Sequence, residues 1–258
     1  MQSDYLSVTE LAGDEVTVEQ VGRMCQRYYW AGTYCHGKEV LEAGCGTGQG
    51  AGYLAGLARR YRAGDYSEKI LRIARAHYGE RIMFQRFDAQ QMPFEKDSFD
   101  VVILFEAIYY LPSAERFIAE CRRVLRTGGK VLIATANKDL YDFNPSPHSY
   151  TYYGVPELRD LFRQNGFTSV FYGNTPVSAL SWRQRVLRPV KKFVVNSGLM
   201  PTTMAGKRLL KRFVFGSLVP MPPEITAGMV PCVDPAPISG NLPDRIHKVI
   251  FCAATIPE

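Results

Sequence analysis

Residues 40–50 read VLEAGCGTGQG, and this stretch decides how the rest of the sequence is interpreted. Four of the seven positions from Gly44 to Gly50 are glycine, directly after a short apolar run and directly before AGYLAGL at 51–57. Glycine is costly to order and packs nothing, so it is placed where backbone turns tightly or lies close to another group. A strand, a glycine turn and a helix in this order predict a turn that binds a ligand.

Strand and helix patterns alternate on both sides of this turn. Strands are predicted at 38–43, 61–65, 81–87, 99–105, 130–135, 167–173 and 247–254. Helices are predicted at 17–31, 47–60, 113–125 and 156–164, and a further one begins after Ser67. Such alternation is typical of an α/β fold with a doubly wound, Rossmann-like parallel sheet.

Bulk properties exclude several classes of protein. The 258 residues are 46% hydrophobic and contain no run of 18 apolar residues, so we expect one domain without a transmembrane helix. The first 16 residues are polar and acidic, which argues against a signal peptide and for the cytoplasm. The six cysteines form no CxxC pair, so we expect neither disulfides nor a metal site.

Two interpretations of the glycine turn compete on local pattern. GTGQGA at 46–51 fits the GxGxxA form of a dinucleotide fingerprint, which would predict NAD binding, but one such match is weak. ExGxGxG at 42–48 adds an acidic residue, Glu42, two positions before the first glycine.

Downstream motifs favour the second interpretation. VLEAGCGTG (40–48), GDYS (64–67), FDAQQMPFEKDSFDVV (87–102) and RVLRTGGKVLIA (123–134) resemble class I S-adenosylmethionine-dependent methyltransferases, particularly the ubiquinone-biosynthesis-like (type 11) subgroup. The resemblance spans about residues 38–173 and the final strand. It implies a seven-stranded sheet with an antiparallel last strand, and S-adenosyl-L-methionine as the cofactor.

The resemblance also implies roles for residues at the turn and at the strand ends. Asp65, about 20 residues beyond the turn, would accept both ribose hydroxyls. Asp88 and Ala89 would meet adenine. The methionine end would lie near a set of residues on the turn and beyond the fourth strand: Glu42, Gly44, Gly46, Gly48 and Glu106. Tyr66 would also contact the cofactor. An acid at a strand end is often only a helix cap, and for Glu106 that alternative stays open.

The sequence predicts catalytic residues less specifically than residues that bind the cofactor. Methyl transfer mostly requires alignment of nucleophile and methyl group, and a general base only when the acceptor must lose a proton. Tyr109, after the fourth strand, and His148, in the loop after the fifth, are the candidates. A structural role for His148 stays the stronger alternative.

A basic insertion separates the sixth strand from the seventh. Residues 161–223 hold ten Lys and Arg and no acidic residue, although the whole chain is only +6. We expect 174–245 to form a mostly helical lid, with basic amphipathic helices at 181–196 and 207–216. Three interpretations stay open for these helices: a solvated surface, attraction of an anionic substrate, or peripheral contact with an anionic membrane through 181–216. No nucleic-acid motif accompanies the charge.

We therefore predict a single methyltransferase domain over 1–258. It would comprise an N-terminal helical cap (1–37), a cofactor-binding core (38–173), the basic lid (174–245) and a final strand (246–258). The predicted function is S-adenosylmethionine-dependent methylation of a small molecule in biosynthesis, at oxygen first, possible acceptors being anionic or lipid-like. Methylation at nitrogen or carbon, transfer of another group from the same cofactor, and a non-catalytic binding protein are the alternatives. The acceptor and the oligomeric state are not encoded in any recognisable pattern.

Overall fold

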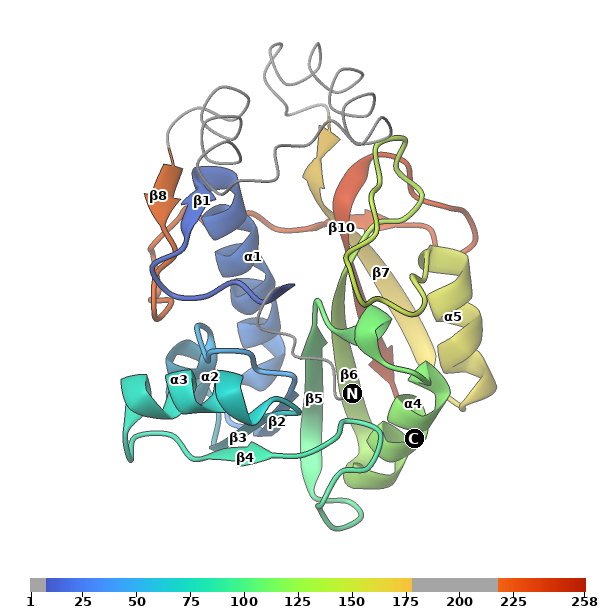
Figure 1. The fold of residues 1–258 in the computed structure, drawn as a ribbon. Coiled ribbons are helices and arrows are strands. Elements are labelled where there is room, and N and C mark those ends of the chain that lie inside the picture. The colour runs from blue at the N-terminus through green and yellow to red at the C-terminus, as the bar shows by residue number, and fades with distance from the viewer. Residues whose placement is uncertain (1–7, 178–217) are drawn as a thin grey trace.

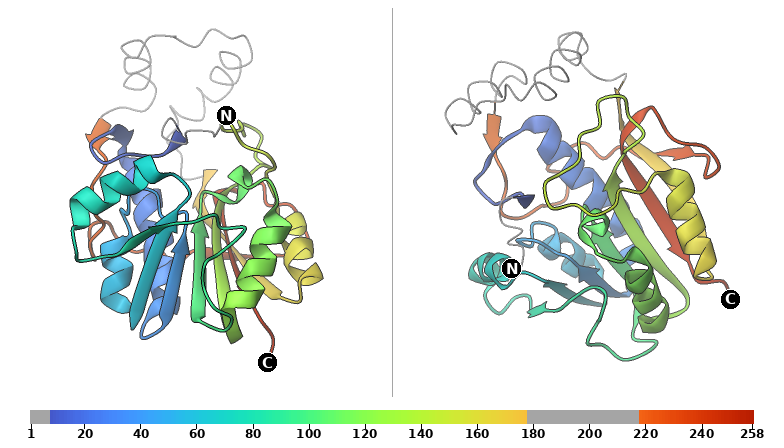
Figure 2. Two further views of the ribbon diagram at one scale, coloured as in Figure 1. Left: turned by 60° about the horizontal axis from the view of Figure 1, so that its bottom comes forward. Right: turned by 45° about the vertical axis from the view of Figure 1, so that its right-hand side comes forward.

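A mixed sheet forms the middle layer of the computed structural model, which describes residues 8–177 and 218–258, with helices on both of its faces (Figures 1 and 2). Eight strands are hydrogen-bonded in the order β4-β3-β2-β5-β6-β10-β7-β9. Their bounds are Glu39–Ala43 (β2), Arg60–Asp65 (β3), Phe84–Arg86 (β4), Phe99–Phe105 (β5), Leu125–Ala136 (β6), Thr168–Pro176 (β7), Ala236–Ile238 (β9) and His247–Thr255 (β10).

The strand directions confirm the predicted doubly wound fold. Strands β4, β3, β2, β5 and β6 pair in parallel, and β10 lies between β6 and β7, antiparallel to both. Seven strands were predicted, and the eighth is β9, which pairs antiparallel with β7. Its three residues, API, show no alternating pattern, and Pro237 is tolerated because β9 lies at the sheet edge.

Five α-helices lie within residues 8–177 and 218–258, and three of them begin at a side-chain cap. The five are α1 (Val18–Cys35), α2 (Ala51–Leu57), α3 (Glu68–Tyr78), α4 (Ala114–Val124) and α5 (Val155–Gln164). The Thr17 hydroxyl accepts from the Gln20 N–H, while the Gln20 side chain accepts from the Thr17 N–H. The hydroxyls of Ser67 and Ser113 accept from the N–H groups of Ile70 and Arg116 and so cap α3 and α4. Each such cap is worth about 1 kcal/mol.

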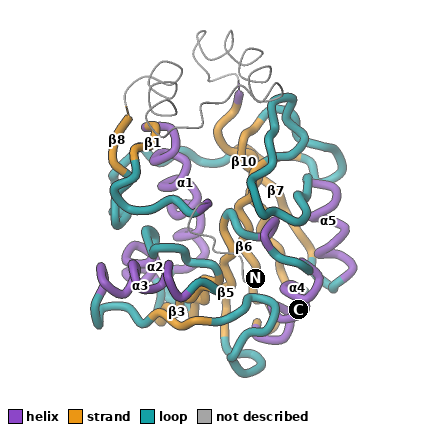
Figure 3. Tube along the Cα trace, viewed as in Figure 1, coloured by secondary structure: helices purple, strands orange, loops and turns teal. Residues whose placement is uncertain are grey.

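Figure 3 shows helices on both sides of the strands. Among the described residues, three apolar clusters form the core, and the two largest lie on opposite faces of the sheet. Phe117 of α4 and Phe162 of α5 are fully buried on one face. On the other, Trp30 of α1 stacks on Phe251 of β10 with ring centroids 4.7 Å apart. Because β2 pairs in parallel with both β3 and β5, the carboxyl ends of these three strands lie side by side, between α1 and the loops that follow the strands.

The chain before β10 holds α1 in place from outside. Strand β8 (Leu218–Pro220) pairs antiparallel with β1 (Glu15–Thr17), beside α1 in Figure 1. Beyond β8, the hydroxyl of Tyr29 donates to the carbonyl of Thr226 over 2.8 Å. The amide of Ile225 donates to the carbonyl of Gln49, in the glycine turn, over 2.7 Å. The segment after β8 thus connects α1 to the turn.

Some boundaries differ from the prediction. Helix α2 begins at Ala51 rather than near 47, because the glycine turn continues to Gly50. Strand β6 begins at Leu125, directly after α4, and a shift in register against β5 follows where 127–129 were expected to be a loop. A short 3-10 helix, η2 (Ile108–Tyr110), follows β5. The expected lid helices at 181–196 and 207–216 lie outside the described residues, so the division into cap, core and lid stays a prediction.

Candidate functional site

The glycine turn has a backbone that other residues adopt only with strain. Strand β2 ends at Ala43, and Gly44 and Gly46 follow with φ of +72° and +58°. A Cβ on Gly44 would lie 3.4 Å from both Ala107 and Leu104, so the turn also lies against the end of β5. Glycine at these positions lets the backbone turn tightly, and the N–H groups of Gly44 and Gly46 donate to the Gly64 carbonyl over 2.8 Å and to Asp65 Oδ2 over 3.1 Å.

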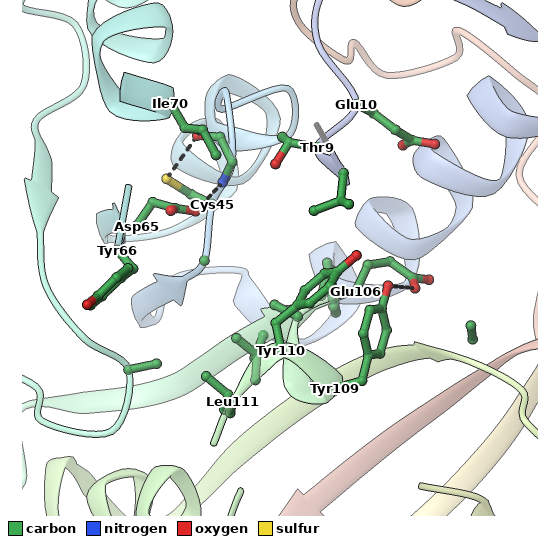
Figure 4. A pocket seen from close by; sticks show the side chains of 18 of the residues that line it. Thr9, Glu10, Cys45, Asp65, Tyr66, Ile70, Glu106, Tyr109, Tyr110 and Leu111 are labelled. Carbon is green, nitrogen blue, oxygen red and sulfur yellow. Dashed lines mark hydrogen bonds between the residues drawn. The ribbon is translucent and has the colours of Figure 1, made fainter. Parts of the chain in front are cut away.

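A cavity of about 490 Å³ opens beside this turn, a size typical of small-molecule sites. Eight of the eleven residues predicted from the sequence line it: Gly44, Gly46, Asp65, Tyr66, Asp88, Ala89, Glu106 and Tyr109. They come from the ends of four strands, β2, β3, β4 and β5, and from η2. Figure 4 shows Asp65 and Tyr66 across the cavity from Glu106 and Tyr109. The cavity therefore brings together residues that the sequence spreads over 66 positions.

Asp65 ends β3 and faces the glycine turn. Its Oδ2 accepts from the Gly46 N–H over 3.1 Å, and its Oδ1 accepts from the Ser67 N–H over 2.9 Å. Burial raises the pKa of Asp65, although these backbone hydrogen bonds oppose the increase. A carboxylate has about four acceptor positions, so each oxygen keeps capacity for another donor.

Asp88 closes its own turn next to Ala89. Its Oδ1 accepts from the Gln90 N–H over 2.8 Å and from the Gln90 side chain over 3.1 Å. Gln90 in turn accepts from the amide of Ser113, the cap of α4, over 2.9 Å. The local role anticipated for a strand-end acid is thus present here, together with a position in the cavity wall.

Glu106 occupies the first position after β5 with φ of +50°. Positive φ is uncommon for a residue other than glycine and tends to occur at functional sites. Its Oε2 accepts from the Tyr109 hydroxyl over 3.1 Å, the bond drawn at the lower right of Figure 4. Burial, followed by the nearby Glu106 charge, raises the pKa of Tyr109 well above its usual range. Tyr109 is therefore a hydrogen-bond donor at neutral pH.

Glu42 lies behind the cavity rather than in its wall. It is 1% exposed and accepts hydrogen bonds from the hydroxyls of Tyr28 on α1, over 2.7 Å, and Tyr61 on β3. Burial raises the pKa of Glu42 to about 7, against the effect of both tyrosine hydrogen bonds. Glu42 was predicted to lie near the methionine end of the cofactor, but it is absent from the cavity lining and its oxygens accept from two tyrosines instead.

Gly48 and His148 are also absent from the residues that line the cavity. A Cβ on Gly48 would lie 3.1 Å from the rings of Phe84 and Tyr78, so this glycine allows close packing of aromatic side chains. His148 is exposed in the loop between β6 and α5, with φ of +66°. Neither placement by itself supports contact with a bound ligand.

The remaining wall comes from residues that the sequence analysis did not select. Helix α1 contributes Gln20, Arg23 and Arg27, the segment before it contributes Glu10, and β10 contributes Lys248. The helical spacing of positions 20, 23 and 27 places them on one side of α1. That polar stripe on a largely buried helix was the available signal.

Arg27 pairs with carboxylates on both sides of it. Its guanidinium nitrogens lie 3.8 Å from Glu10 Oε2 and 3.9 Å from Glu106 Oε1. Burial lowers the pKa of Arg27, but these two carboxylates outweigh that effect and the net pKa is raised. Its charge is therefore retained in the wall of the cavity.

Comparison with known proteins finds a methyltransferase domain within the chain. Residues 41–133 match a family model described as a methyltransferase domain. A probable S-adenosylmethionine-dependent methyltransferase of Mycolicibacterium smegmatis is 36% identical over 148 residues, which cover 54% of this chain and 57% of the relative. Residues 41–133 therefore match the methyltransferase domain that the resemblance predicted, and the relatives matched there are named S-adenosylmethionine-dependent methyltransferases, whose cofactor is S-adenosyl-L-methionine.

Two further comparisons extend over more of the chain. An O-methyltransferase of Penicillium expansum, cnsE, is 28% identical over 219 residues, 78% of this chain and 72% of the relative. The structure of a possible histamine N-methyltransferase from Thermotoga maritima superposes with a TM-score of 0.58 at 14% identity and covers 92% of each chain. Such low identity supports the fold alone.

The chain spans little more than half the length of the first two curated relatives, 57% and 51%. The activity of those relatives is therefore a proposal for this chain. No helix among residues 8–177 and 218–258 is both long and apolar enough to cross a membrane.

Proposed function

We propose that this protein transfers the methyl group of S-adenosylmethionine to an oxygen atom of a small-molecule acceptor. The observation that carries the proposal is the convergence of the glycine turn, Asp65, Asp88 and Glu106 on one cavity. We expect the reaction to take place in the cytoplasm and to serve biosynthesis.

The described residues fit the cofactor in size and chemistry. Asp65 keeps acceptor capacity for a ribose diol, and the Asp88–Ala89 pair offers a carboxylate for an exocyclic amine and a backbone N–H for a ring nitrogen. Ile70 and Leu111 also line the cavity and provide apolar contact for a base. Gly44 and Gly46 leave space for the methionine portion.

When bound, the cofactor supplies a methyl group activated by a positively charged sulfur. The protein then has to bring the acceptor oxygen into line with that group and to exclude water, which is worth several orders of magnitude in rate. The aromatic wall formed by Tyr109, which stacks on Tyr152 with centroids 4.3 Å apart, supports such alignment. Helix α1 closes the opposite side.

A hydroxyl acceptor must also lose its proton, and we assign this step to Glu106. Its carboxylate lies in the cavity wall with Oε2 held by Tyr109. Tyr109 was the residue selected from the sequence, but the raised pKa of its hydroxyl makes it a donor that orients Glu106. His148, the other candidate, is exposed outside the cavity lining, so we give it no catalytic role.

Oxygen is preferred as the acceptor atom for two reasons. A carboxylate that takes up a proton is needed for hydroxyl acceptors more than for amines. In addition, the relative that matches this chain over 72% of the relative's length is named an O-methyltransferase. An anionic or lipid-like acceptor is supported by the basic residues at 181–216. We expect no nucleic-acid partner.

The experiment that tests the proposal has two parts. Calorimetry with S-adenosylmethionine, S-adenosylhomocysteine and NAD should show binding of the first two only. Incubation with tritiated S-adenosylmethionine and a panel of phenols, alcohols and carboxylic acids, with amines and thiols as controls, should label hydroxyl compounds. Binding of NAD with no binding of either methionine-derived ligand would refute the proposal, and label confined to amines would exclude the oxygen acceptor.

A further inference from the structure

Two carboxylates balance the charge of the Arg27 guanidinium, but within residues 8–177 and 218–258 it makes no hydrogen bond. The side chain is 15% exposed, and its Nε is buried with no hydrogen-bond partner among the described residues. The distances of 3.8 and 3.9 Å to Glu10 and Glu106 are too long for N–H···O hydrogen bonds. A guanidinium has five N–H donors in a planar fork, so most of its donor capacity remains in the cavity wall.

Buried donors without acceptors are rare in folded proteins, and each costs about 1–3 kcal/mol. Arg27 also loses hydration at a site whose burial opposes its charge. The Arg27 guanidinium lies beside the cavity with N–H donors that lack acceptors. A ligand in the cavity would supply those acceptors and so explain the arrangement. The partner that matches this fork best is a planar anion that accepts two parallel hydrogen bonds.

We infer that Arg27 binds a carboxylate group of a ligand in this cavity. The inference rests on the proposed function and assigns to it a residue from α1. Arg23 and Lys248 line the same cavity, and both pair with Glu19, so Arg27 is the cation that lies between Glu10 and Glu106. The carboxylate has two sources in the proposed reaction: the methionine end of the cofactor, or an acidic acceptor.

Position alone is compatible with both sources. Glu106, which pairs with Arg27, precedes Ala107, and Ala107 lies against Gly44 of the glycine turn. This places Arg27 within reach of the methionine end. The same Glu106 is the proposed proton acceptor, which places Arg27 beside the acceptor as well.

The test uses the full chain and three variants. Arg27→Gln removes the charge, Arg27→Lys keeps the charge but not the fork, and Arg163→Gln removes a cation that is 73% exposed on α5. Thermal unfolding of each unliganded variant establishes that it is folded. Calorimetry then gives Kd for S-adenosylhomocysteine and for 5′-methylthioadenosine, which lacks the amino-acid group. Ligand-observed NMR compares benzoate with its neutral counterpart benzamide, with and without S-adenosylhomocysteine.

If the methionine carboxylate is the partner, Arg27→Gln raises the Kd for S-adenosylhomocysteine about 10- to 100-fold and the Kd for 5′-methylthioadenosine less than about twofold. Arg27→Lys should fall between wild type and Arg27→Gln, and Arg163→Gln should match wild type. If an acidic acceptor is the partner, both nucleosides keep their affinity while benzoate loses at least about tenfold and benzamide does not change.

Two results would overturn the inference. One is an unchanged affinity for all four ligands in Arg27→Gln. The other is an equal loss for S-adenosylhomocysteine and 5′-methylthioadenosine with benzoate unaffected, since Arg27 would then support the shape of the site only. The benzoate measurement requires no cofactor, so it still tests Arg27 if the wild-type protein binds no methionine-derived ligand and the proposed function fails.

Discussion

Replacing Asp65 tests whether its carboxylate accepts hydrogen bonds from the two hydroxyls of a ribose. Each of its oxygens already accepts one backbone N–H, from Gly46 at 3.1 Å and Ser67 at 2.9 Å, and keeps capacity for one more donor. Hydrogen bonds to a charged acceptor are worth about 1.5–3 kcal/mol each. Two hydroxyls that share a partly desolvated carboxylate should therefore contribute about 3 kcal/mol, which is roughly 150-fold in Kd.

Asp65→Asn keeps the size of the side chain but removes the charge and one acceptor. Calorimetry should compare adenosine with 2′,3′-dideoxyadenosine, which lacks both hydroxyls. The wild type should prefer adenosine by about 150-fold, and the variant should lose most of that preference. Asp100→Asn is the matched control, because Asp100 accepts from the Glu39 N–H over 2.8 Å outside the cavity lining. If Asp65→Asn weakens both nucleosides equally and keeps their ratio, the ribose role is refuted.

Three further predictions follow from the contacts described above. Glu106→Gln should lower kcat for a hydroxyl acceptor about 10²- to 10⁴-fold, more than it lowers affinity for S-adenosylhomocysteine; equal effects would argue against proton transfer. An acid whose pKa is raised by folding takes up a proton as the chain folds, so Glu42 should make wild-type stability fall as pH rises from about 4.5 to about 7. Glu42→Gln should remove that slope in urea unfolding, with a gain of about 1–3 kcal/mol at pH 8 relative to pH 4.5, and a slope that persists would exclude Glu42 as its source. Gly50→Ala, just before α2, should destabilise by about 1–3 kcal/mol, because its Cβ would lie 2.0 Å from the Tyr28 ring. Gly56→Ala, within α2, meets nothing within 4 Å and should be neutral or stabilising. Urea midpoints of the two glycine variants compare them directly.

The fold was predictable where short-range patterns carry the information. The continuous apolar run at Phe99–Phe105 became β5 with the predicted bounds, and Ser67 and Ser113 begin α3 and α4 through their own side chains. Strand β9 was missed because its pairing with β7 is a tertiary contact that three residues cannot encode. The start of β6 was missed because the glycines at 128–129 lie within the strand rather than in a loop.

In the candidate site too, residues placed by local sequence were predictable, and residues placed by tertiary packing were not. The positions of Asp65 and Asp88 were predictable because Asp65 is the last residue of β3, Asp88 lies two residues beyond β4, and the carboxyl ends of parallel strands meet. The position of Glu42 was not, because the two tyrosines that surround it come from α1 and β3, and only packing brings them together. Arg27 was missed for a similar reason. The polar residues at positions 20, 23 and 27 mark one side of α1, but this local pattern does not distinguish a side that faces solvent from one that faces a cavity.

The place of β10 has a consequence for how the protein is made. It forms a ladder with β6 on one side and with β7 on the other, yet it follows both in the chain. While the ribosome synthesises residues up to 246, the facing edges of β6 and β7 have no partner, and an unpaired strand edge is a template for aggregation. A nascent chain of this protein is therefore a natural client for chaperones until its final strand emerges, and a stop codon just before His247 should yield insoluble product rather than a weakened enzyme.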